Sequence, residues 1–228
     1  MSLLGQAAVA MWWNIRPEQR SEFGDWHSHE HFPERLGIPG FRRGSRWTST
    51  LDAEGFFVLY ELERYETLSS SGYLERLNAP TPWSTKMMPH HLNMVRSQCR
   101  VAASFGGGVA TSLATIRLSP AAANESDLKT ALTRTLRALA LKPGLTGAHL
   151  LMTDTPRTTA PTAEQQIRGS DGAADWIVLL SGYDPEAVQE AVSNGLSTLA
   201  LRKMGAQEQS IMGRYKLAFT MTPQDVAV

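Results

Sequence analysis

The chain passes twice through the same order of predicted elements, namely strand, helix, strand, strand, helix, strand. Apolar residues at alternate positions predict strands, and apolar residues three or four positions apart predict helices. A βαββαβ unit is the ferredoxin-like motif, four antiparallel strands with two helices on one face. The fold class is therefore predicted to be α+β, with two ferredoxin-like units in one chain. The predicted strands are 7–15, 41–49, 55–63, 94–104, 109–118, 147–152, 176–183 and 210–221, and the predicted helices are 17–32, 67–78, 126–141 and 185–201.

Short segments match between the two halves and keep their order. Met94-Val95-Arg96 corresponds to Met212-Gly213-Arg214, and two further pairs occur in the predicted hairpins. Matches in a common order indicate a tandem repeat. The offset between matching segments grows within the second hairpin, which predicts a loop insertion near 154–173, a polar stretch in which we recognise no chemistry. The glycines at 106–108 suit a chain reversal, so the predicted domains are 1–106 and 107–228.

Composition excludes several kinds of partner. Lysine plus arginine and aspartate plus glutamate both total 22, so the net charge is zero and the chain has no basic stripe for nucleic acid or anionic membrane. Cys99 is the one cysteine, which excludes an internal disulfide and favours a reducing compartment. No segment approaches the ~20 apolar residues that span a bilayer. We expect a cytoplasmic protein whose partner is a small molecule, with a possible homodimer through edge strands.

One segment carries a resemblance to a known superfamily. "DWHSHEHFPERLGIPGFRRGSRW", followed by "FFVLYELE", resembles the EthD-like and antibiotic-monooxygenase-like branches of the dimeric α/β-barrel superfamily. The resemblance implies that the two units close face to face as an intrachain barrel. It also implies a cofactor-independent monooxygenase, cyclase or isomerase that acts on an aromatic or polyketide-like acid.

Two alternatives to this enzyme remain open from the sequence. One is a non-catalytic ligand-binding or structural barrel whose interior is filled by its own ion pairs. The other is a haem protein, which is disfavoured because the sequence lacks the haem-ligand motif of the superfamily. We expect no cofactor, with haem or a divalent metal as the alternative.

Three histidines stand at alternate positions in the first predicted helix. At about 100° per residue, His29 lies nearly opposite His27, so the three cannot share one face. His27 and His31 share the inner stripe, and His31 lies at the predicted helix end before Pro33. We predict His31 or His27 as the catalytic acid or base. A structural role for both histidines, or a metal site with a third ligand from elsewhere, is the alternative.

The strands and one loop supply the predicted substrate-binding residues. We expect ligands inside the barrel, with Cys99 facing the helices and the arginines facing the lumen. The alternative is that ion pairs such as Arg46 with Glu61 fill the lumen. The loop 79–94, rich in proline, is predicted to form a lid on the barrel mouth. The predicted substrate-binding residues are Tyr60, Arg46, Glu61, Arg96, Arg100, Trp83 and His90.

Overall fold

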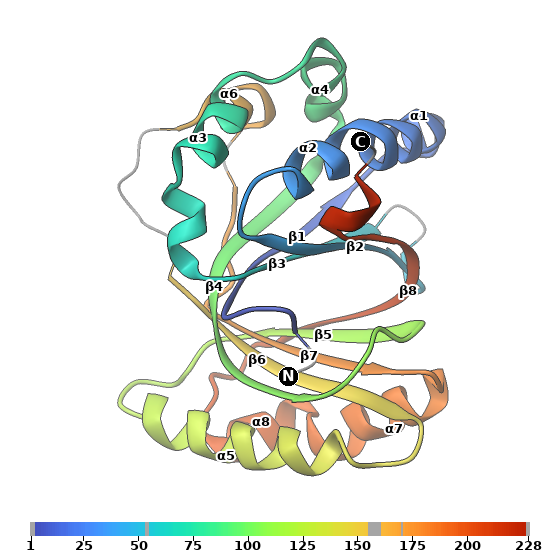
Figure 1. Cartoon of the computed structure of the whole chain (residues 1–228). Helices are drawn as coiled ribbons and strands as arrows, with labels where there is room; N and C mark the ends of the chain where they lie inside the picture. Colours follow the sequence, from blue (N-terminus) through green and yellow to red (C-terminus); the bar gives the residue numbers. More distant parts are fainter. Residues whose placement is uncertain (1–2, 53–54, 155–160, 170, 227–228) are drawn as a thin grey trace.

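The strands of the protein close into one antiparallel barrel. A computed structural model describes residues 3–52, 55–154, 161–169 and 171–226, and within them eight strands follow the order β1-β3-β2-β8-β5-β7-β6-β4 around the barrel (Figure 1). The predicted α+β class and the closed barrel are thus confirmed. The strands are β1 (Ala7–Asn14), β2 (Phe41–Ser49), β3 (Gly55–Leu62), β4 (Leu92–Gly106), β5 (Ser112–Leu118), β6 (Leu145–Thr153), β7 (Trp176–Gly182) and β8 (Ile211–Met221).

Helices cover the outside of the barrel in two layers. The layer over the first half contains α1, α2, α3, α4 and α6, and the layer over the second half contains α5, α7 and α8 (Figure 1). No helix in the described part of the chain is long and apolar enough to cross a membrane. The helical segments are η1 (Pro17–Gln19), α1 (Arg20–Trp26), η2 (His27–His31), α2 (Phe32–Leu36), η3 (Tyr65–Ser69), α3 (Ser71–Asn78), α4 (Pro82–Met87), η4 (Met88–His90), α5 (Glu125–Leu139), α6 (Ala163–Arg168), α7 (Pro185–Gly195), α8 (Thr198–Met204) and η5 (Pro223–Asp225).

The two halves have the same strand order. The first half runs β4-β1-β3-β2 and the second runs β8-β5-β7-β6. Antiparallel pairing of β2 with β8 and of β4 with β6 joins the halves and leaves no open sheet edge in the barrel. The predicted homodimer through edge strands therefore has no free edge of this barrel to use.

The sequence predicts that the first helix ends before Pro33, but in the structure the helix continues past this proline. The N–H of Phe32 donates to the carbonyl of His27, five residues back, so η2 is one wide turn of π-helix. Pro33 then lies at the second position of α2, and the wide turn directly before it accommodates a residue that has no N–H to donate. The wide turn carries the helix past the proline and places the three histidines in its widest part.

Apolar side chains fill both the lumen and the helix–sheet interfaces. Inside the barrel, Trp12, Phe57 and Leu59 of the first half pack against Leu113 and Leu179 of the second. The outward side chains of β1 and β3 pack instead beneath the first helical layer. Because both faces of β1, β3 and β7 are buried, these strands carry apolar side chains on both faces.

The predicted orientation of β4 is reversed in the structure. Cys99 faces the lumen and packs with Ala8 and Leu151, whereas Arg96 lies under the helices and donates to the hydroxyl of Tyr73 at 2.6 Å. Long arginine stems pack on apolar surface while their charged ends find polar partners, which makes a buried outer face compatible with arginine. Because both faces of this part of β4 are covered, the alternation of polar and apolar residues does not show which face points into the lumen.

Candidate functional site

His27 and His31 lie buried between the first helical layer and the outer face of the sheet, and His29 is exposed. Helical pitch predicted this division correctly. Aromatic rings surround the buried pair: His31 stacks on Trp26 at a centroid distance of 4.7 Å, and His27 meets the edge of Phe32 at 4.5 Å. The two imidazoles are themselves 5.3 Å apart.

Polar atoms without a hydrogen-bond partner gather around these histidines. We call His27, His31, Glu34, Arg35 and Tyr60 the buried polar cluster. Nδ1 of both histidines, both carboxylate oxygens of Glu34, one guanidinium nitrogen of Arg35 and the hydroxyl of Tyr60 are buried and without a hydrogen bond. More than about 90% of buried polar groups in proteins have a partner, so a group of such atoms calls for an explanation such as a bound water, an ion, a ligand or a catalytic role.

Glu34 links the members of the cluster at distances longer than a hydrogen bond. One of its oxygens, Oε2, lies 3.8 Å from His31 Nδ1 and 3.7 Å from a guanidinium nitrogen of Arg35. Burial raises the pKa of Glu34, and the charge of Arg35 opposes that rise. The carboxylate is therefore placed to orient the His31 imidazole without binding it tightly.

Burial sets the protonation states in the cluster. It lowers the pKa of His31 well below 6.5, with Arg35 as the next cause, and lowers that of His27 likewise, with Arg46 next. Burial also raises the pKa of Tyr60 far above its usual value of 10. At neutral pH the cluster thus holds neutral imidazoles, each with a lone pair that can accept a hydrogen bond or a proton, and a neutral phenol that can donate a hydrogen bond.

The insertion near 154–173 completes the site. Its helix α6 lies over the first half, where Glu164 forms a buried ion pair and hydrogen bond with Arg35. The sequence suggested only a polar loop here, although Thr162 and Gln165 form a capping box, a signal that marks a helix start. Residues 155–160 and 170 of the insertion lie outside the described residues.

Arg46 joins the same layer as the cluster, although we predicted it in the lumen. Its guanidinium donates to Ser28 Oγ at 3.0 Å and lies 5.6 Å from the ring centroid of Phe23. The structure therefore brings together five of the predicted site residues, but under the helices rather than inside the barrel. They are His27, His31, Tyr60, Arg46 and Arg96.

Three of the remaining predicted residues lie elsewhere. Arg100 is exposed on the outer face and pairs with Asp154 at 2.9 Å. The half-buried indole of Trp83 on α4 packs against the core of the first half and donates to Glu22 at 3.3 Å. His90 is half-buried at the end of η4, and the loop that we predicted as a lid is in fact mostly helical.

His91, which follows the predicted site residue His90, is also a buried histidine of the first half. It is 8% exposed, lies 5.0 Å from Trp13 between ring centroids, and its Nδ1 is 3.2 Å from the carbonyl of Met88. Burial lowers its pKa to about 3. Of the two adjacent histidines, His91 is thus buried, whereas the predicted site residue His90 is only half-buried.

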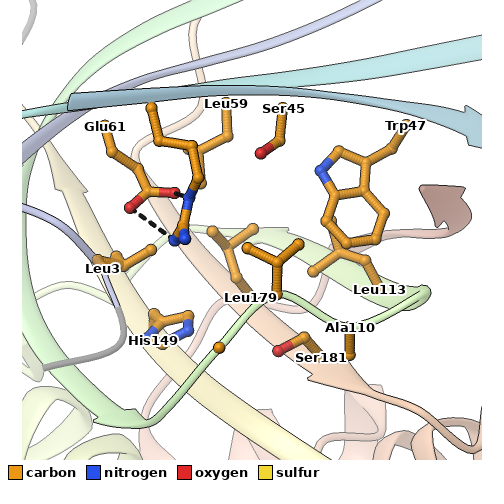
Figure 2. A pocket seen from close by; sticks show the side chains of 13 residues that line it. Leu3, Ser45, Trp47, Leu59, Glu61, Ala110, Leu113, His149, Leu179 and Ser181 are labelled. Carbon is orange, nitrogen blue, oxygen red and sulfur yellow. Dashed lines mark hydrogen bonds and ion pairs between the residues drawn. The ribbon is translucent and has the colours of Figure 1, made fainter. Parts of the chain in front are cut away.

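Glu61 faces the lumen, as predicted, but its partner is Arg43 rather than Arg46. Arg43 binds the carboxylate with two nitrogens at 2.7 and 2.9 Å, and the N–H of Leu4 donates to it at 2.7 Å. Figure 2 shows Glu61 at the wall of a pocket, and Arg43 also belongs to the lining of that pocket. The pocket lining is Leu3, Arg43, Ser45, Trp47, Leu59, Glu61, Gly108, Val109, Ala110, Leu113, His149, Leu179 and Ser181.

This pocket is too small for an organic substrate. Its volume is about 40 Å³, room for roughly three water molecules at ~10–15 Å³ each. The Arg43–Glu61 ion pair fills part of the lumen, in agreement with one of our alternatives for Glu61. Among the described residues no three histidine, cysteine, aspartate or glutamate side chains converge as ligands for a metal ion.

The described residues of the second half form no equivalent of the buried polar cluster. Beneath its helices, Leu128, Leu132 and Leu136 of α5 pack against Leu150 and Val178 of the sheet. The helix–sheet space of this half is thus an ordinary apolar core. Any site of this kind occurs once in the described chain, in the first half.

Comparison with known proteins supports the fold. No model of a protein family matches the sequence, and no curated protein matches it either. An anthrone oxidase-like protein of solved structure is 14% identical with a TM-score of 0.68, and the match covers 97% of this chain and 95% of that one. The two proteins share this fold over nearly the whole of both chains.

Two further solved structures agree. Provisionally assigned monooxygenases from Fusobacterium nucleatum and Lactobacillus acidophilus are 7% and 10% identical, with TM-scores of 0.63 and 0.60. Each match covers 96% of this chain, and 96% and 97% of the other chains respectively. Identities this low show a common fold over the whole chain and nothing finer.

Proposed function

We propose that the chain is an enzyme that removes a proton from a small aromatic or polyketide-like acid in the buried polar cluster, and that the resulting anion reacts with dioxygen. The observation that supports this proposal is the group of buried polar atoms without a hydrogen bond on His27, His31, Glu34, Arg35 and Tyr60. The surrounding aromatic rings offer flat apolar surface to a ring system. Strongly shifted pKa values beside unpartnered polar atoms are typical of functional sites.

Each member of the cluster suits one part of this reaction. The neutral His31 imidazole accepts the substrate proton, and Glu34 beside its Nδ1 stabilises the imidazolium that forms. The phenol of Tyr60 and the guanidinium of Arg35 then stabilise the negative charge that develops on the substrate oxygen. His27, which packs against the ring of His31, adds a second neutral acceptor.

Anthrone is the natural test substrate, because one structural neighbour is an anthrone oxidase-like protein. Its methylene group loses one proton to the base, and the carbanion transfers electrons to dioxygen to form a hydroperoxide at that carbon. Loss of water from the hydroperoxide, with departure of the second proton, gives anthraquinone. One anthrone and one dioxygen thus yield one anthraquinone and one water, and no further reductant is needed.

The experiment measures anthraquinone formation by absorbance under air, with the uncatalysed rate subtracted. We expect turnover by the wild type and a loss of about 10²–10⁴-fold in His31→Gln, the range for a general base. His29→Gln is the matched control, since His29 lies on the same helix but is exposed, and it should keep full activity.

Two results would overturn the proposal. Equal rates for His31→Gln and the wild type would remove the assigned base. Anthrone and related hydroxylated anthrones that bind without any turnover would favour the non-catalytic ligand-binding alternative.

A further inference from the structure

We propose a second binding site, for a small aromatic monocarboxylate, at the barrel end opposite the pocket of Figure 2. A cleft of about 240 Å³ lies there, where β1 and β5 end and β3, β4 and β8 begin. This volume lies below the ~300–1,000 Å³ of pockets for drug-sized ligands, which limits the occupant to one or two rings. The described residues that line it are Trp12, Trp13, Asn14, Ser49, Leu51, Asp52, Gly55, Phe56, Asn93, Arg117, Met212, Gly213 and Tyr215.

Arg117 supplies the positive charge of this cleft. Its guanidinium lies 5.0 Å from the ring centroid of Trp12, and no carboxylate among the described residues is within ion-pair distance of it. The side chain is half-buried, and burial lowers its pKa while Tyr215 opposes that change. A partly desolvated cation without an acidic partner is stabilised by an anionic ligand, and arginine binds a carboxylate through two parallel hydrogen bonds.

Aromatic side chains form flat walls beside the guanidinium. Tyr215 lies against Gly213, where a Cβ atom would approach its hydroxyl oxygen and Cε2 to 2.5 Å, so only glycine leaves room for the ring. The indole of Trp12 is fixed by a hydrogen bond from Nε1 to Thr115 at 3.2 Å. These fixed faces suit an aromatic ring whose carboxylate points to Arg117.

Asp52 narrows the ligand class. It is the one carboxylate in the described lining and accepts a hydrogen bond from Asn14 at 3.3 Å. Its negative charge disfavours a ligand with a second carboxylate. We therefore expect monocarboxylates such as 1-naphthoate to bind more tightly than the dianion phthalate.

The charged part of this site is separate from the proposed catalytic residues, although Trp13 of its lining lies 5.9 Å from His27 between ring centroids. Trp12, Arg117 and Tyr215 belong to the lumen side of the barrel, whereas His27 and His31 lie beneath the helical layer on its outside. A ligand in the cleft thus leaves the buried polar cluster free. The two proposals can fail separately.

The test is calorimetric titration of the full chain with 1-naphthoate and, in parallel, with the neutral 1-naphthylmethanol. In Arg117→Met, which keeps the apolar stem over Trp12, affinity for naphthoate should fall about tenfold or more, while Arg117→Lys keeps part of it. Arg214→Met, on an exposed arginine that bonds Gln189, is the matched control and should bind as the wild type does. Equal affinity in Arg117→Met and the wild type would overturn the site, as would equal affinity for the acid and the alcohol.

A second readout locates the ligand. The indole N–H resonance of Trp12, assigned from Trp12→Phe, should shift on titration of the wild type with naphthoate. His31→Gln should show the same shift, and loss of naphthoate binding in that variant would place the ligand in the buried polar cluster instead. An unchanged Trp12 resonance in a wild type that binds naphthoate would also overturn the proposal.

Discussion

At the scale of single residues, Glu164 controls the charge balance of the buried polar cluster. Its side chain and that of Arg35 are only 5% and 3% exposed, so the pair is separated from water. Glu164 belongs to the second half of the chain, and its carboxylate binds the guanidinium of Arg35 in the first half. Removal of one member of such a pair leaves the other charge buried and uncompensated.

We therefore expect Glu164→Gln to destabilise the fold by about 3 kcal/mol, because a neutral amide replaces the counter-charge of Arg35. The matched control is Glu208→Gln, which removes the exposed partner of Arg202 and should cost about 0–1 kcal/mol. Urea unfolding at pH 7 measures both changes. Equal stabilities of the two variants would contradict a structural role for the buried pair.

The sequence predicts correctly which side chains of the first helix point inward. It does not predict which side chains of the strands face the lumen and which face the helices. Helical pitch alone placed His27 and His31 inside and His29 outside. In contrast, Arg46 and Arg96 were assigned to the lumen and lie under the helices. A strand that is buried on both faces gives no polarity signal for its orientation, because both faces carry apolar residues with a few paired polar ones.

At the scale of elements, α2 approaches β2 at Gly44. A Cβ atom there would lie 2.1 Å from Cε1 of Phe32, so glycine permits the contact that brings the π-turn and its histidines onto the sheet. Phe32 packs in turn on Tyr60 at a centroid distance of 5.3 Å. The position of the buried polar cluster thus depends on the absence of a Cβ atom at Gly44.

We expect Gly44→Ala to destabilise the protein by about 1–3 kcal/mol, since Phe32 must leave its rotamer or α2 must shift. Gly24→Ala is the control: a Cβ atom at this position in α1 meets nothing within 4 Å, and alanine should stabilise the helix by about 0.5–1 kcal/mol. Thermal unfolding of both variants provides the comparison. Stabilisation by Gly44→Ala would contradict the close contact.

The order of the strands along the chain could be predicted, whereas the continuation of the first helix and the short helices α4 and α6 could not. Strands follow from local apolar runs, and each of the eight predicted strands appears within a few residues of its expected bounds. The first helix continues past Pro33 through a π-turn, which depends on packing rather than on local propensity. The short helix α6 obtains its stability from contacts with the first half, so its own sequence carried only the capping-box signal.

At the scale of the whole molecule, the lumen core belongs to both halves. Trp12 and Phe57 from one half meet Leu113 and Ile177 from the other. The segments 1–106 and 107–228, which we propose as two fused units, should therefore not be stable as separate monomers. Each alone would expose its lumen face and self-associate.

Separate expression of the two segments, followed by mixing, tests this expectation. We expect light scattering to show oligomers or aggregates of each segment, and a 1:1 complex of native mass after mixing. The intact chain is the reference for circular dichroism and unfolding. A monomeric first segment with the unfolding midpoint of the whole chain would contradict a shared core.

Buried histidines couple the stability of the whole molecule to pH. His27, His31, His91 and His149 are all buried, and burial is the main cause that lowers the pKa of each, to about 3 for His91 and about 4 for His149. In the unfolded chain their pKa is near 6.5. Below this value the unfolded state binds protons that the folded state does not, so stability falls as pH falls.

Two buried carboxyls act in the opposite direction. Burial raises the pKa of Glu34 and Glu61, so on acidification the folded state takes up protons on them before the unfolded state does. Each group changes the free energy of unfolding by up to about 1.4 kcal/mol per pH unit. The effect of the four histidines therefore exceeds the opposite effect of the two carboxyls. We therefore expect the free energy of unfolding to be flat above pH 7 and to fall by about 1–3 kcal/mol per unit between pH 6.5 and 5.

Urea unfolding at pH 8, 7, 6 and 5 measures this slope. His149→Gln should reduce it by up to about 1.4 kcal/mol per unit down to pH 4, because one neutral buried imidazole is removed. His29→Gln should leave it unchanged, since that imidazole is exposed in the folded chain. A stability that rises on acidification from pH 7 to 5 would mean that the histidines are charged in the folded state, and they could not then accept a substrate proton at neutral pH.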